Sequence, residues 1–138
     1  MEAEFFNKLS NMNEDKAKVE GYRDLIVWQK SITLVKQIYQ LTQNFLTDEK
    51  FGLISQMRRA AVSIPSNIAE GQARRTTGDY VRFVSVAEGS LAELDTQLIV
   101  AIELSFCTKI QIKEIFSLMV EIRKMLNALP RSLMSKIN

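Results

Sequence analysis

A chain of 138 residues is long enough for one domain with a modest core. Its hydrophobic fraction of 46% and charged fraction of 25% are ordinary for a folded protein and exclude an intrinsically disordered chain. The net charge of +2 argues neither for nor against binding of nucleic acid. The low number of glycines and prolines, five and two, argues against a turn-rich sandwich or barrel. The composition therefore favours helices.

Residues 1–20 alternate charged residues with isolated apolar ones, so they predict a mobile N-terminal arm rather than a signal peptide. No later stretch reaches the length of a membrane-spanning helix. The single cysteine, Cys107, cannot form an internal disulfide. These features predict a cytoplasmic protein with an arm at 1–20 and one domain over 21–138.

Two helices are predicted in the first half of that domain. Apolar residues recur every three or four positions over residues 25–45, with Asp24 as the expected N-cap. A second such pattern covers about 48–71 and ends at Gly71, a residue that favours a helix end. Pro65 lies inside this second helix and removes a backbone donor, which predicts a kink.

Two longer helices are predicted in the second half, each opened by the spacing of a capping box, at Thr76 with Asp79 and at Thr108 with Gln111. The apolar seam of the third helix alternates steps of three and four and comprises Val84, Ala87, Leu91, Leu94, Leu98 and Ala101. The fourth helix continues to about residue 133. Two long helices with a short connection must fold back on each other. The sequence thus predicts an all-α fold, an antiparallel up-and-down four-helix bundle whose second helix is kinked near Pro65.

Reactive side chains are scarce. The chain has no histidine, which removes the usual general base and the commonest zinc ligand. No glycine-rich nucleotide motif occurs, and one cysteine cannot build an iron–sulfur or structural zinc site. Glu88, Glu93 and Asp95 fit a solvated acidic face better than a catalytic group, and Cys107 lacks a base to form its thiolate. We predict a non-enzymatic protein with no catalytic residue, metal or cofactor.

Charge is unevenly distributed along the chain. Residues 50–82 and 106–138 each carry a net charge of +4, whereas 83–105 carry −4. Arginine suits phosphate oxygens because its planar fork can bind two of them. The candidates for contacting an RNA or DNA backbone are Arg58, Arg59, Arg74, Arg75, Arg82, Lys109 and Lys113. Solvated helix surface is the alternative interpretation of these residues.

A polar stripe follows one flank of the second predicted helix. It consists of Arg59, Ser63, Ser66 and Glu70, spaced i, i+4, i+7 and i+11. Small side chains in such a stripe let another helix approach closely. The stripe predicts either packing within the chain or an interface between subunits, with its charged residues in charge-assisted contacts.

Three stretches together resemble a known family. They read YRDLIVWQKSITLVKQIYQLT, FGLISQMRRAAVSIPSNIAEGQARR and SLAELDTQLIVA, and they resemble the bacterial four-helix-bundle proteins encoded within intervening sequences of 23S ribosomal RNA genes. The resemblance covers about residues 21–129 and implies an up-and-down bundle that assembles into a homopentamer. That family is distantly similar to the accessory protein of diversity-generating retroelements, a pentameric bundle that binds a reverse transcriptase and nucleic acid.

Two functions follow from the residues and the resemblance. The first is a non-enzymatic oligomeric module that binds RNA or DNA backbone through its basic helix ends, in a manner weakened by salt. The alternative is a protein-interaction scaffold for a nucleic-acid enzyme such as a reverse transcriptase. An enzyme that uses carboxylates is the least favoured reading because no catalytic motif accompanies them.

Overall fold

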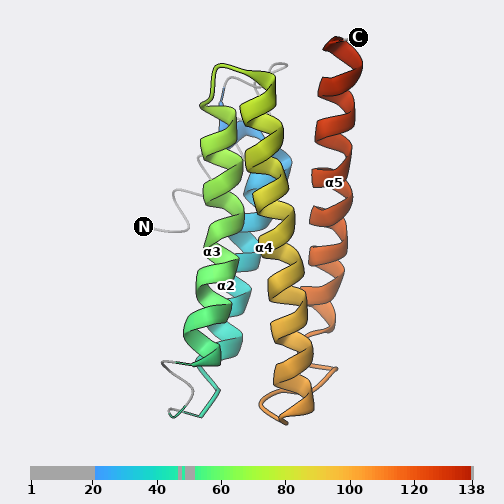
Figure 1. The fold of residues 1–138 in the computed structure, drawn as a ribbon. Coiled ribbons are helices and arrows are strands. Elements are labelled where there is room, and N and C mark those ends of the chain that lie inside the picture. Colours follow the sequence, from blue (N-terminus) through green and yellow to red (C-terminus); the bar gives the residue numbers. More distant parts are fainter. Residues whose placement is uncertain (1–20, 47, 49–51, 138) are drawn as a thin grey trace.

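The computed structural model describes residues 21–46, 48 and 52–137, with side chains described through Leu129. A 3-10 turn, η1 (Tyr22–Asp24), precedes four helices: α2 (Ile26–Thr42), α3 (Leu53–Gln72), α4 (Thr77–Glu103) and α5 (Lys113–Ile137). Successive helices run in opposite directions, so the described chain is an all-α, up-and-down four-helix bundle (Figure 1). The fold class is confirmed. The predicted arm at residues 1–20 lies outside the described residues.

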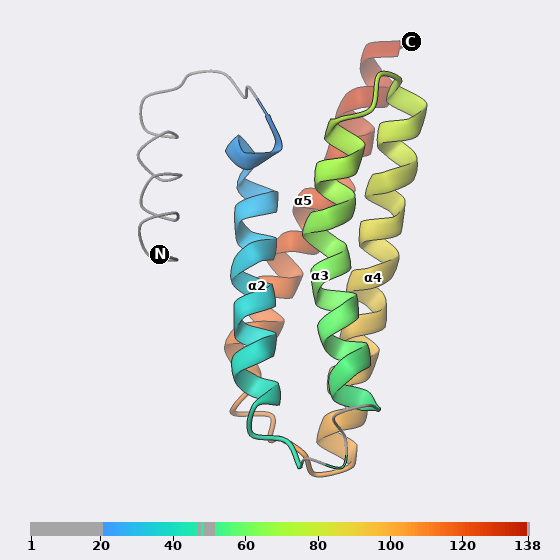
Figure 2. The same ribbon diagram turned by 90° about the vertical axis from the view of Figure 1, so that its left-hand side faces the viewer.

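The four helices form a closed ring of neighbours. α3 packs against both α2 and α4, and α5 packs against both α4 and α2. The α3–α4 turn lies at the end of the bundle where α2 begins and α5 ends (Figure 2). The α2–α3 and α4–α5 connections lie at the opposite end. This alternation decides which loop residues can act together.

The core is the predicted seam of α4 and its counterparts on the other helices. Every residue of the α4 seam is buried: Val84, Ala87, Leu91, Leu94, Leu98 and Ala101. Fully buried side chains in the same core cluster include Leu34 of α2, Ile64 of α3 and Ile122 of α5. Burial of large aliphatic side chains contributes roughly 1.5 to 3 kcal/mol each before the entropy cost of folding. The seam therefore provides the main stabilisation of the bundle.

The helix ends agree only in part with the predictions. Thr76 is the N-cap of α4 and its side chain accepts a hydrogen bond from the backbone of Asp79, at 3.2 Å. Asp24 is not the N-cap of α2, because it closes the preceding 3-10 turn and Leu25 takes the extended capping position. Gly71 does not end α3 either, since that helix continues to Gln72 and no described glycine has a positive φ.

The second predicted capping box is present but does not open a helix. Thr108 donates its backbone N–H to the side chain of Gln111 at 2.9 Å, and its hydroxyl accepts from the backbone of Gln111 at 3.3 Å. Residues 109–112 form turns, and α5 begins only at Lys113. The box therefore shapes the connection between α4 and α5.

α4 ends in a Schellman motif in which serine takes the place of the usual glycine. Ser105 has φ of 62°, and its backbone N–H donates to Ile102 at 2.9 Å. Phe106 donates its backbone N–H to Ala101 at 2.9 Å. These two bonds satisfy carbonyls that the helix end would leave unpaired. A left-handed backbone conformation costs an L-residue roughly 1 to 2 kcal/mol, so the hydrogen bonds of the motif hold Ser105 in a conformation that serine disfavours.

Pro65 lies within α3, and the helix runs from Leu53 to Gln72 on both sides of it. Pro65 is buried. The missing backbone donor removes one hydrogen bond from the helix ladder. The kink near Pro65 stays a prediction.

Candidate nucleic-acid interface

The predicted basic residues do not form one patch. Arg74, Arg75 and Arg82 lie at the α3–α4 turn, whereas Lys109 and Lys113 lie beside the α4–α5 connection at the opposite end. A helix rises 1.5 Å per residue, so the 27 residues of α4 separate the two groups by roughly 40 Å. The antiparallel topology thus divides the candidates into two separate sites.

Arg58 is engaged within the chain near the end of α2. Its Nε donates to the hydroxyl of Thr42 at 2.9 Å, and one Nη donates to the carbonyl of Tyr39 at 3.4 Å. Its guanidinium also lies 4.4 Å from the ring centroid of Tyr39. A cation suits the carboxyl end of a helix, where the carbonyls carry partial negative charge. These contacts favour a structural role for Arg58 in joining α2 to α3.

The polar stripe of α3 is divided between the interior and the surface. The Ser63 hydroxyl shares a 2.8 Å hydrogen bond with the Ser90 hydroxyl of α4. Asn67 donates to both the carbonyl and the hydroxyl of Ser63, at 2.7 and 2.9 Å. The other members are exposed: Arg59, Ser66 and Glu70. Ser63 therefore makes a contact within the chain, while a subunit interface along the stripe stays a prediction.

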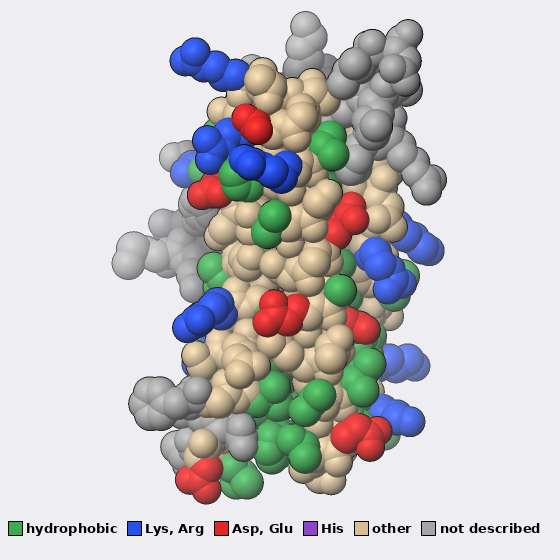
Figure 3. Space-filling model, in the orientation of Figure 1, with side chains coloured by type: hydrophobic (Ala, Val, Ile, Leu, Met, Phe, Trp, Pro, Cys, Tyr) green, Lys and Arg blue, Asp and Glu red, His purple; other side chains and the backbone are tan. Residues whose placement is uncertain are grey.

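The α3–α4 turn gathers the remaining arginines into a cluster that we call the arginine end, namely Arg74, Arg75 and Arg82. The guanidinium carbons of Arg74 and Arg82 lie 4.7 and 5.3 Å from the ring centroid of Phe83. Arg82 also lies 3.7 Å from a carboxylate oxygen of Asp79. Within the described part of the chain, no carboxylate pairs with Arg74 or Arg75. Figure 3 shows Lys and Arg side chains gathered toward this end of the molecule, with acidic side chains beside them.

A shallow hollow of about 290 Å³ lies beside the arginine end. Arg74, Arg75 and Thr77 line it, together with Tyr80 and Leu129. The first turn of α4 opens here, where unpaired N–H groups and the helix dipole favour an anion. Burial raises the pKa of the Tyr80 hydroxyl, so this group stays protonated as a hydrogen-bond donor. The charges and donors at this hollow suit phosphate oxygens.

Gly71 explains why the turn is so compact. A β-carbon at Gly71 would lie 3.0 Å from Cβ of Phe83 and 3.4 Å from the backbone oxygen of Tyr80. The last turn of α3 therefore lies directly on the first turns of α4. This close approach holds Phe83, and with it the two arginines that pack on its ring.

The residues considered as catalytic candidates lie in different places, with Glu88 and Asp95 lining a hollow between α4 and α5 that neither Glu93 nor Cys107 lines. Cys107 is buried, and burial raises the pKa of its thiol, which opposes the reactive thiolate. Glu93 accepts a hydrogen bond from Gln97 at 3.1 Å and is exposed. Among the described residues, no group of three or more potential metal ligands lies close enough to hold an ion. No described helix has the length and apolarity needed to cross a membrane.

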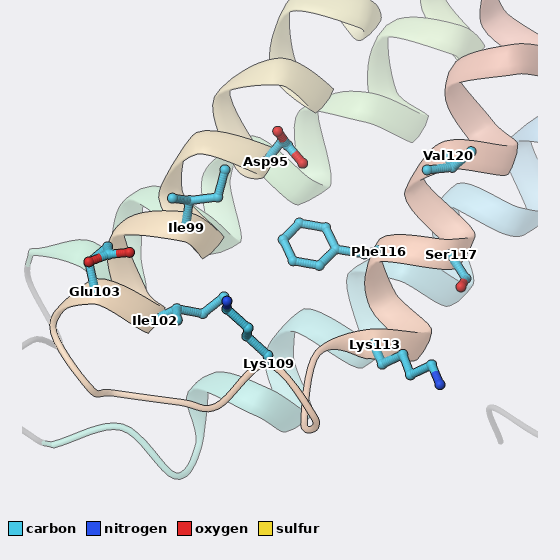
Figure 4. A pocket seen from close by; sticks show the side chains of 9 residues that line it. All are labelled: Asp95, Ile99, Ile102, Glu103, Lys109, Lys113, Phe116, Ser117 and Val120. Carbon is cyan, nitrogen blue, oxygen red and sulfur yellow. The ribbon is translucent and has the colours of Figure 1, made fainter.

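Periodicity did not predict a hollow that lies between α4 and α5. It has a volume of about 610 Å³ and is lined by Ile99 and Glu103 of α4 and by Lys113, Phe116 and Val120 of α5, among others. Phe116 reaches from α5 toward α4, while Lys113 and Glu103 point away from each other on opposite sides (Figure 4). Lys109 extends from the connection toward α4. Two of the predicted phosphate contacts thus line an apolar hollow instead of a cationic surface.

Comparison with known proteins agrees with this architecture. Residues 23–128 match the model of the family described as 23S rRNA-intervening sequence protein. The chain belongs to this family. A crystal structure from Bacteroides thetaiotaomicron, described as a protein with unknown function from the S23 ribosomal protein family, superposes with a TM-score of 0.71. The two chains are 24% identical, and the alignment covers 76% of this chain and 98% of the other. No curated protein matches the chain. Neither description names an enzyme.

Proposed function

We propose that this member of the 23S rRNA-intervening sequence protein family is a non-enzymatic, oligomeric, cytoplasmic module that binds the phosphate backbone of RNA or DNA. The observation that carries the proposal is the arginine end. Two guanidinium groups pack on one ring there, and Arg75, which directly precedes the N-cap Thr76 of α4, lines the same hollow as Arg74. Packing on Phe83 reduces the side-chain freedom that a phosphate contact would otherwise have to remove.

The binding mode is backbone contact with little base selectivity. Phe83 already carries two guanidinium groups on its ring, and Tyr80 is half-buried, so neither aromatic face is open for base stacking. Phosphate contacts release condensed counterions and make affinity fall with salt. We therefore expect RNA and DNA of different sequence to bind with similar affinity and the same salt dependence.

The test is a titration of fluorescein-labelled single-stranded RNA of about 10 nucleotides, followed by anisotropy at several salt concentrations. Each phosphate contact contributes about 0.7 to the slope of log affinity against log salt for single strands. Arg74→Ala with Arg75→Ala is expected to reduce the magnitude of this slope by about 1.4 and to weaken binding at low salt. The matched control is Lys36→Ala with Lys124→Ala, which removes two exposed cations elsewhere.

Three results would overturn the proposal. One is undetectable binding of wild type at low salt, and a second is an equal loss in the arginine and lysine variants. The third is a loss confined to Lys109→Ala with Lys113→Ala, which would place the site at the opposite end of the bundle. Retention of the wild-type slope by the control variant, together with its loss in the arginine variant, supports the arginine end.

A further inference from the structure

The hollow beside the arginine end is lined by the α3–α4 turn and by three helices. The turn supplies Arg74, Arg75 and Thr76, the first turns of α4 supply Thr77 and Tyr80, and the rest comes from the end of α3 and from α5. No carboxylate is among its described lining residues. Its volume of about 290 Å³ is close to the lower limit of about 300 Å³ for small-molecule pockets. It therefore has room for one small group, and a longer stretch of a bound strand lies outside it.

This hollow is rich in hydrogen-bond donors. Arg74 and Arg75 each carry five N–H donors, and the hydroxyls of Thr77 and Tyr80 add one donor each. Within the described part of the chain, neither hydroxyl has a hydrogen-bond partner and no carboxylate pairs with either arginine. All four side chains are therefore available to an acceptor that enters the hollow.

The backbone around the hollow is fixed by its own hydrogen bonds. Arg74 donates its backbone N–H to the carbonyl of Gly71 at 3.1 Å, and Tyr80 donates to the carbonyl of Thr76 at 3.1 Å. The guanidinium carbon of Arg74 lies over the ring of Phe83, and a planar guanidinium in that position presents its N–H groups at its edges. The donors are thus positioned before a ligand arrives, which lowers the entropy cost of binding.

A phosphate at the end of a strand fits this donor set better than one inside it. An internal phosphodiester carries one negative charge and continues into the strand on both sides. A terminal phosphomonoester carries a charge of about −1.5 to −2 at pH 7 and has three strong acceptor oxygens. Two arginines and two hydroxyls in one small hollow match that charge and those three oxygens.

We infer that the hollow beside the arginine end binds the terminal phosphate of an RNA or DNA strand. This inference rests on the proposed function and deepens it by naming which phosphate is recognised. Arg74 and Arg75 contact the terminal group together with the hydroxyls of Thr77 and Tyr80. Arg82 does not line the hollow and contacts phosphates further along the strand. The strand end is recognised by its charge and its oxygens, and the base is not read.

The test compares RNAs of about 10 nucleotides that carry a 5′-phosphate, a 3′-phosphate or hydroxyls at both ends, followed by the anisotropy of fluorescein on a central base. A hydroxyl-ended RNA of about 12 nucleotides has nearly the same total charge as the phosphorylated RNAs, so it controls for charge alone. At equal salt, a terminal phosphate is expected to raise affinity about tenfold over this charge-matched RNA, and the two phosphorylated forms show which end is bound. DNA of the same sequence should show the same ratio, because the ligand is the phosphate.

Matched variants place the preference in the hollow. Tyr80→Phe and Thr77→Val each remove one hydroxyl with little change in shape and should reduce the preference about threefold. Arg75→Ala should remove most of it. Arg82→Ala is the control, because Arg82 has the same charge and packs on Phe83 but does not line the hollow. This control should weaken binding of all the RNAs and leave their ratio unchanged.

The outcomes separate this inference from the proposed function. Equal affinity for the phosphorylated and the charge-matched RNAs, with a salt slope that still depends on Arg74 and Arg75, would overturn the inference and leave backbone binding in place. Absence of binding to every RNA at low salt would overturn both. A preference that survives Arg75→Ala but is lost in Arg82→Ala would place the terminal phosphate outside the hollow.

Inorganic phosphate, added at constant ionic strength, distinguishes a strand end from a free anion. It is expected to displace the phosphorylated RNA only at a much higher concentration than the same RNA without its label, because the strand also contacts Arg82. Displacement by inorganic phosphate at the same concentration as by unlabelled RNA would overturn the inference, since the hollow would then bind free phosphate.

Discussion

Substitution of glycine by alanine is predicted to have opposite effects on stability at two helical positions. Gly71 of α3 is buried, and its added β-carbon would meet Cβ of Phe83 at 3.0 Å. Gly89 of α4 is exposed, and an added β-carbon there would have no heavy atom within 4 Å. Alanine therefore adds a methyl group to a tight contact at one site and to open space at the other.

The magnitudes follow from helix propensity and packing. Replacing glycine by alanine in a helix interior stabilises it by about 1 kcal/mol. Gly89→Ala is expected to show this full gain. At Gly71 a smaller gain near the helix end is opposed by overpacking, which costs about 1 to 3 kcal/mol because the Phe83 β-carbon cannot rotate away. Gly71→Ala is therefore expected to lose about 1 kcal/mol, a difference of about 2 kcal/mol between the variants.

The assay is thermal and urea unfolding followed by circular dichroism, with all proteins at one concentration because association shifts the apparent stability. For a chain of this size, about 1 kcal/mol shifts the Tm by roughly 4 °C. The two variants should thus differ by about 8 °C. If Gly71→Ala were as stable as Gly89→Ala, the close approach of α3 to Phe83 would not be the reason for glycine at this position.

Three further substitutions or conditions test individual contacts. Ser105→Gly is expected to raise the free energy of unfolding by about 1 kcal/mol, because glycine adopts the positive φ at the end of α4 without strain. An unchanged or lower unfolding midpoint would contradict the Schellman assignment. Arg58→Ala should lower the free energy of unfolding by about 1 to 2 kcal/mol, because it loses the contacts with Thr42 and the Tyr39 ring. Arg59→Ala removes an exposed side chain and should change this free energy by less than about 0.5 kcal/mol. Equal effects of the two substitutions in urea unfolding would refute this difference. The raised pKa of the Cys107 thiol predicts that stability declines as pH rises above about 8.5, because the thiol ionises first in the unfolded chain. Cys107→Ser is expected to remove this part of the pH dependence. The same dependence in both proteins would exclude the thiol as its source.

The apolar period predicted the fold because the bundle buries one stripe on each helix. The seam of α4 keeps a three-and-four spacing from Val84 to Ala101, and every member is buried. Such a pattern specifies which face of a helix is inside without any knowledge of its neighbours. The capping-box spacing also predicted the hydrogen bonds at Thr76 and Thr108, because each side chain bonds to a residue only three positions away, although only Thr76 caps a helix.

The helix ends that were predicted wrongly depend on contacts made after folding. Glycine is a residue type that is common at helix ends, yet Gly71 instead lets α3 approach Phe83 of α4 closely. Asp24 has the side chain of an N-cap, yet the 3-10 turn at Tyr22–Asp24 shifts the capping position to Leu25. Local propensity identifies residues that tolerate such positions, whereas the tertiary contact selects among them.

The candidate site was predicted in composition but not in arrangement. The sequence gathers basic residues near two interhelical turns, but consecutive turns of an up-and-down bundle lie at opposite ends. Arg74 and Arg75 are therefore far from Lys109 and Lys113. The hollow between α4 and α5 was missed because periodicity shows which residues face the core, not how closely two neighbouring helices pack. Ile99 and Val120 lie outside the seams, and only the spacing of α4 and α5 shows that both line one hollow.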